Sequence, residues 1–151
     1  MSTLKARLSD DLRSAMKARD ETVTGTLRMA LAAVRHAEVS GKAARELSDD
    51  EVLGVLTKEA KKRREAADAY AGAGRAELAD RELAELTVID RYLPAQLSDR
   101  ELAELVTGAI TAGGFAGPAA MGPAMKAVQA EVAGRAEGAR VAAEVRRQLS
   151  A

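Results

Sequence analysis

The sequence has no cysteine, one histidine and only three aromatic residues among 151. The absence of cysteine excludes disulfide bonds, thiolate zinc sites and cysteine nucleophiles. Basic and acidic residues are equal, 23 against 23, which argues against a protein held to nucleic acid or anionic lipid by bulk charge. No apolar run approaches the roughly 20 residues that span a bilayer. The N-terminal residues are charged and lack the apolar core of a signal peptide, so we expect a cytoplasmic protein with no membrane partner.

Alanine and helical periodicity dominate what is present. Alanine is the strongest helix former, whereas aromatic residues, which favour strands, are few. Apolar residues recur every three or four positions from end to end, and no stretch alternates apolar and polar residues over the length of a strand. The pattern predicts an all-α fold, with a four-helix N-terminal region followed by a small C-terminal three-helix bundle.

Helix boundaries divide the chain into two parts. The motifs Ser48-x-x-Glu51 and Ser98-x-x-Glu101 are predicted capping boxes at helix starts. The fourth helix is predicted to end at Pro94, because a residue before proline avoids helical geometry. We therefore predict an N-terminal helical domain over residues 1–93 and a C-terminal three-helix domain over residues 98–151.

No set of residues fits a catalytic centre. His36 falls nearly opposite the apolar face of its predicted helix, which favours an exposed surface histidine. The serines lie at helix starts, where capping explains them, and none lies in a G-x-S-x-G elbow. Acidic clusters also begin helices, where the helix dipole attracts them, and no phosphate-binding G-x-x-x-x-G-K loop is present. We predict no catalytic residue, no metal and no cofactor.

The second and third helices carry basic residues that are candidates for binding. Arg28 and Arg35 lie together beside the apolar stripe of the second helix. Either their aliphatic side-chain carbons pack over the edge of the core, or their guanidinium groups bind a phosphate or a partner carboxylate. In the basic run 58–64, pairing at i, i+4 accounts for most charges, and Lys58 and Lys62 stay unpaired on one face. These two lysines are candidates for RNA contact, and a solvated, paired helix surface is the alternative.

In the C-terminal part, two glycine turns carry one basic residue each. Lys126 follows Met121-Gly122-Pro123, and Arg135 follows Gly134. Free amides at such a helix start suit an anion, whereas tight packing of three short helices would explain the same glycines. Both readings stay open from the residues alone.

Several short segments together resemble the GatB/YqeY family over nearly the whole chain. They are Leu27-Arg28-Met29, the run Lys58 to Arg64, Ala73-Gly74-Arg75, Tyr92 to Ser98, Met121-Gly122 with Met125-Lys126, and Gly134-Arg135-Ala136. The resemblance implies a C-terminal domain similar to the tail of the B subunit of the tRNA-dependent amidotransferase, which helps to hold tRNA. The family's label, carbon–nitrogen ligase activity with glutamine as amido donor, belongs to that whole complex. Glu137 departs from the family, whose members commonly have aspartate there.

We predict from these observations a non-catalytic module that binds tRNA or associates with an amidotransferase or synthetase subunit. Its predicted contact residues are Arg28, Arg35, Lys58, Lys62, Lys126 and Arg135. One alternative is a protein-interaction scaffold without direct RNA contact. Another is a free-standing enzyme that releases ammonia from glutamine, for which no nucleophile can be named.

Overall fold

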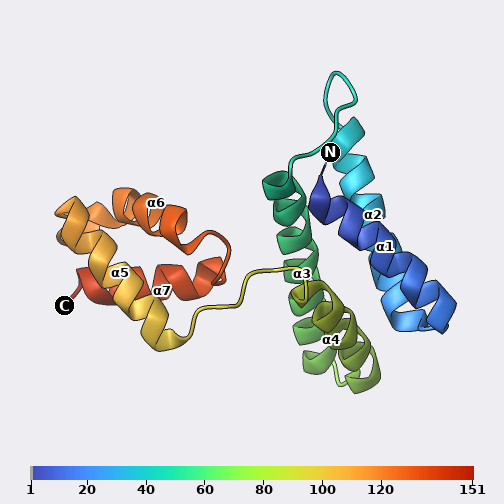
Figure 1. Cartoon of the computed structure of the whole chain (residues 1–151). Helices are drawn as coiled ribbons and strands as arrows, with labels where there is room; N and C mark the ends of the chain where they lie inside the picture. The colour runs from blue at the N-terminus through green and yellow to red at the C-terminus, as the bar shows by residue number, and fades with distance from the viewer. Residues whose placement is uncertain (1) are drawn as a thin grey trace. The chain divides into compact units, whose positions relative to one another are not determined.

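The computed structural model describes residues 2–151, and every regular element within them is a helix (Figure 1). The predicted all-α fold is therefore confirmed. The chain divides into two compact units, residues 1–93 and 94–151. The helices are α1 (Thr3–Ala18), α2 (Glu21–Val39), α3 (Asp49–Gly72), α4 (Ala76–Asp90), α5 (Asp99–Gly113), the short 3₁₀ helix η1 (Pro118–Ala120), α6 (Met121–Val132) and α7 (Gly138–Leu149).

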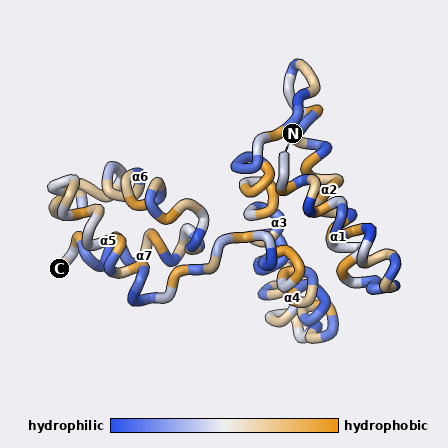
Figure 2. Tube along the Cα trace, in the orientation of Figure 1, coloured by the Kyte–Doolittle hydropathy of each residue, from blue (hydrophilic) through white to orange (hydrophobic). Residues whose placement is uncertain are grey.

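The unit over residues 1–93 pairs α1 with α2 and α3 with α4 around one apolar core. The helices face the core with the residues that their periodicity predicts, and apolar and polar stretches alternate along the chain trace (Figure 2). Fully buried members of this core are Leu8, Leu27, Val34, Val52, Leu56 and Ile89.

Asp49, the first residue of α3, ties the start of α1 to the start of α3. Its carboxylate accepts hydrogen bonds from the Ser2 hydroxyl and the Thr3 hydroxyl, each at 2.5 Å, and from the Leu4 amide at 3.0 Å. These bonds lower the pKa of Asp49 to about 2. The Ser2 hydroxyl also caps α1 by accepting from the Lys5 amide at 3.1 Å. Two helix starts are thus satisfied by one cluster of polar groups.

The unit over residues 94–151 packs α5, α6 and α7 around an aliphatic core. The entering segment is fixed by the Leu97 amide, which donates to the Arg135 carbonyl at 2.7 Å. Gly113 ends α5 directly beneath the ring of Phe115, which is half-buried against the same core. Fully buried members of this core are Val106, Val128, Val132, Val141 and Val145.

The structure differs from the sequence predictions at one helix end and at one helix cap. Helix α4 ends at Asp90 rather than at Leu93, because the last residues before Pro94 wind into a turn in which the Leu93 amide donates to the Asp90 carbonyl. Only one of the two predicted capping boxes is complete, the one at Ser98. At Ser48 the serine caps α3, but the Glu51 carboxylate is bound by Arg45 from the preceding loop.

Candidate functional site

Three of the predicted contact residues in the first unit are exposed cations. Arg28, Arg35 and Lys58 form no hydrogen bond and no ion pair with any residue in the described range 2–151. Lys62 differs, because its amine lies 3.2 Å from the Glu59 carboxylate. The expectation that Lys62 is unpaired is therefore wrong: at i, i+3 it reaches the same glutamate that Arg63 reaches at i, i+4.

The two predicted residues of the second unit have different surroundings. Lys126 is exposed on α6 and has no partner among the described residues. The Arg135 guanidinium is half-buried and donates to the carbonyls of Val132 at 3.0 Å and Glu131 at 2.9 Å. These are carbonyls of the last turn of α6, so Arg135 closes that helix end.

Arg63 is a buried cation whose place on the apolar side of α3 is indicated by periodicity. It continues the apolar stripe of α3 through Val52, Leu56 and Ala60, and its residue is 5% exposed. Its guanidinium lies 2.9 Å from the Glu59 carboxylate and 3.3 Å from that of Glu85 on α4.

The surroundings of Arg63 continue to the surface of α2. Its Nη2 lies 3.7 Å from the Met29 sulfur. Burial opposes ionisation of Glu59, but hydrogen bonds from Arg63 and Lys62 outweigh it and hold the Glu59 pKa below its ordinary value. Arg63 therefore connects the interior of α3 and α4 with the outer part of α2.

A second polar cluster surrounds Tyr92 just before the junction. Its hydroxyl donates to the Asp11 carboxylate, and the Arg7 guanidinium lies 4.6 Å from the centre of its ring. Burial, followed by the bond to Asp11, raises the pKa of Tyr92 above its ordinary value. Tyr92 is thus held against α1 just before the junction segment.

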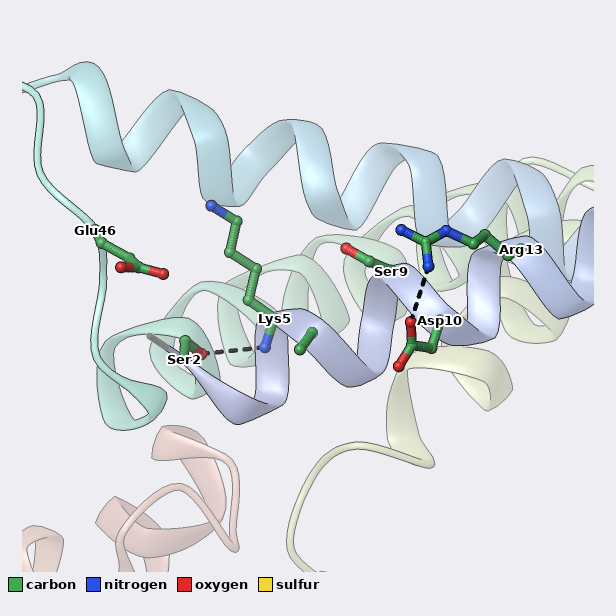
Figure 3. A pocket seen from close by; sticks show the side chains of 7 residues that line it. Ser2, Lys5, Ser9, Asp10, Arg13 and Glu46 are labelled. Carbon is green, nitrogen blue, oxygen red and sulfur yellow. Dashed lines mark hydrogen bonds and ion pairs between the residues drawn. The ribbon is translucent and has the colours of Figure 1, made fainter.

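A shallow pocket of about 240 Å³ lies on α1 (Figure 3). Lys5, Ser9 and Arg13 project from α1, and Glu46 comes from the segment between α2 and α3. The Lys5 amine is held 2.7 Å from Glu38, and Arg13 lies 3.3 Å from Asp10. The cations lining the pocket thus already have acidic partners.

The sequence also holds two serine–lysine pairs with S-x-x-K spacing, Ser2–Lys5 and Ser14–Lys17. In the first, the serine hydroxyl donates to Asp49 and the lysine amine binds Glu38. In the second, both residues are exposed on α1 and share no hydrogen bond. Activation of serine by lysine needs a direct contact between the two side chains, which neither pair makes.

Two further findings concern the whole described chain. Between residues 2 and 151, no three histidine, aspartate or glutamate side chains gather in an arrangement that could hold a metal ion. Over the same range, no helix has the length and apolar character needed to cross a bilayer.

Fold and surface together define a small protein of two helical units, in which the predicted contact residues without a partner in the described chain, Arg28, Arg35, Lys58 and Lys126, lie on α2, α3 and α6. The family profile described as "Yqey-like protein" matches residues 5–149, and the chain belongs to this family. A relative from Schizosaccharomyces pombe, "Uncharacterized protein C22F3.15", is 33% identical over 91 residues, which is 60% of this chain and 72% of the relative.

A second relative comes from Eremothecium gossypii and is named "Altered inheritance of mitochondria protein 41, mitochondrial". It is 31% identical over 90 residues, which is 60% of this chain and 49% of the relative. The match thus spans about half the length of that relative.

Proposed function

We propose that this chain is a non-catalytic binding module that contacts the phosphate backbone of tRNA, in the setting of the tRNA-dependent amidation that its family resemblance implies. One observation carries the proposal: Lys58 and Lys126 are exposed, have no acidic partner in the described chain, and have no carboxylate three or four positions away on their helices. Unpaired ammonium groups on polar surfaces suit phosphate. The scarcity of aromatic residues favours contact with backbone and shape over base stacking.

The test compares two double variants of equal charge by binding to tRNA over a range of salt. K58Q with K126Q removes both unpaired lysines. K61Q with R100Q removes one exposed cation from each unit, but these are paired with Glu65 at 3.9 Å and Glu104 at 3.1 Å. We expect the first double variant to weaken binding and to reduce the salt slope by about one per residue, with little change in the second.

Two results would reject RNA binding. One is an equal loss in both double variants, which would indicate bulk charge alone. The other is equal affinity of the unmodified chain for tRNA and for an unrelated polyanion such as heparin. Turnover of glutamine by the purified chain would instead favour the enzymatic alternative. We include in the proposal the cytoplasmic location expected from the sequence. The word mitochondrial belongs to the name of the Eremothecium relative and is said of that protein alone.

A protein-interaction role is the second candidate, and a separate observation favours it. Two of the large hydrophobic side chains exposed in the described chain, Met29 and Val39, lie on α2 together with the unpaired Arg28 and Arg35. An RNA backbone would leave such apolar side chains in water.

A further inference from the structure

The side of α2 that faces away from the core has a regular pattern. The helix buries Thr26, Leu27, Ala30, Leu31 and Val34. Counting 100° per residue, the side opposite these carries Ala32 and Val39 along its middle. Arg28 and Arg35 lie along one edge, and Met29 and His36 lie along the other. We name these six residues the outer face of α2, and all six are exposed.

The outer face exposes more apolar surface than a solvated helix needs. Val39 is 63% exposed and Met29 is 43% exposed. They are ten residues apart, which is about 15 Å along a helix. Between them lies Ala32, which is too small to hold a partner away. The face can therefore accept a second helix along its length.

The charge of the outer face has one sign. Arg28 and Arg35 form no ion pair among residues 2–151. The acidic residues of α2 are Glu21, which lies on the same side of the helix about two turns before Arg28, and Glu38. The Glu38 carboxylate is bound by the Lys5 amine and the Leu47 amide, and Arg35 attracts it only from a distance. A partner therefore has to bring carboxylates, and a second copy of the same face would meet like charge.

Met29 rests on a buried side chain, Arg63, that ion pairs hold in place. The Arg63 guanidinium lies against the Met29 sulfur and is itself held by Glu59 and Glu85. Because Arg63 is buried and bound on two sides, it limits the positions that Met29 can adopt. A preformed apolar contact next to unpaired guanidinium groups is the kind of surface that binds strongly, since less order has to be imposed on binding.

We propose that the outer face of α2 binds an acidic amphipathic helix of a partner protein. The partner's apolar side chains pack on Met29, Ala32 and Val39, and its flanking aspartates or glutamates bind Arg28 and Arg35. This inference goes beyond the proposed RNA contact and does not depend on it, because Lys58 and Lys126 take no part.

The test places a photo-crosslinking amino acid, benzoylphenylalanine, at position 32 of the full chain, with position 69 as the control. Ala69 is an exposed alanine on α3, outside the outer face. Both proteins are expressed in the native cells, irradiated and treated with nuclease, and the crosslinked peptides are sequenced by mass spectrometry. We expect position 32 to crosslink to one peptide that is predicted to be helical, with apolar residues every three or four positions and a surplus of aspartate and glutamate.

Charge variants then define the contact. R28E with R35E should reduce the yield at position 32 at least tenfold, and M29A should reduce it severalfold. K58Q with K126Q should leave it unchanged, which separates this inference from the RNA proposal. The inference is overturned if position 32 gives no more crosslink than position 69. Crosslinking to RNA, to a second copy of this chain or to a peptide without an acidic surplus overturns it equally.

Discussion

The two units of this protein treat polar and apolar side chains differently. In the described part of the first unit, the buried polar residues are Ser2, Thr26 and Arg63, and the exposed large hydrophobic residues are Met16, Met29, Val39 and Leu83. In residues 94–151 the buried side chains are all apolar, and no large hydrophobic side chain is exposed. The second unit thus follows the simple rule of apolar inside and polar outside, and the first departs from it in both directions.

These departures lie next to one another at Arg63 and Met29, a buried charge in contact with an exposed apolar side chain. A buried charge contributes less to stability than a well-packed apolar residue of similar size, and an exposed apolar group contributes little. The first unit therefore has features that stability alone does not explain. We interpret them as the signature of a binding surface, and the predictions below test this difference between the units.

Removing Arg63 should have the largest effect and should be confined to the first unit. R63A leaves the carboxylates of Glu59 and Glu85 without their buried partner, and we expect a loss of about 3 kcal/mol in the free energy of unfolding. The value lies at the low end for such pairs, because Glu59 keeps Lys62. Both tyrosines, Tyr70 and Tyr92, lie in this unit, so tyrosine fluorescence during urea unfolding reports on it alone.

A triple variant checks the cause. R63M with E59Q and E85Q removes the charges together and keeps most of the volume, so it should recover most of the lost stability. If the triple variant is as unstable as R63A, the loss comes from packing and not from the unpaired carboxylates. Amide hydrogen exchange in α5–α7 should stay unchanged throughout.

In the second unit, two glycines of α5 should respond in opposite directions. A Cβ at Gly113 would overlap the Phe115 ring, so G113A should displace that ring from the core and cost about 1–3 kcal/mol. A Cβ at Gly108 meets no atom within 4 Å, so G108A should stabilise the helix by about 0.5–1 kcal/mol. Hydrogen exchange of the α5 amides measures both, and effects of the same sign would contradict this account of Phe115.

The fold could be predicted because its signals are local. The i, i+4 spacing of Val52, Leu56 and Ala60 and the serines at helix starts need no knowledge of distant residues. The misjudged details depend on a competing partner. The position of Glu51 in the sequence fits a capping box, but in the structure its carboxylate binds Arg45. Arg45 lies in the preceding loop, and the path of that loop cannot be inferred from the neighbouring residues.

The candidate site was predictable only in part, for the same reason. Helical phase places Arg28, Arg35 and Lys58 on exposed sides, where the structure has them. Glu59 stands at i, i+3 from Lys62 and at i, i+4 from Arg63, and sequence cannot show that it binds both. The burial of Arg63 further depends on Glu85 of α4, which is a tertiary contact.

The two serine caps allow a smaller, direct comparison of the units. S98A removes one arm of the complete capping box at α5 and should cost about 1 kcal/mol in the second unit. S48A removes the cap of α3, whose partner Glu51 stays bound to Arg45, and should cost less than S98A. Hydrogen exchange at the first turns of α3 and α5 measures the difference. An equal or larger cost for S48A would show that the reciprocal glutamate bond, which S98A leaves in place, does not strengthen the serine cap of α5.

Asp49 gives the smallest effect, a dependence of stability on pH that belongs to the first unit. Its pKa is about 2 in the folded chain, against about 3.9 in an unfolded one. Because folding lowers this pKa, the contribution of the ionised carboxylate is complete above about pH 4 and is lost as the pH falls towards about 2. D49N cannot titrate, so its urea midpoint, followed by tyrosine fluorescence, should fall less steeply over this range. Parallel curves for the two proteins would mean that other carboxylates control the acid unfolding of this unit, and that the bonds from Ser2, Thr3 and Leu4 to Asp49 contribute little in solution.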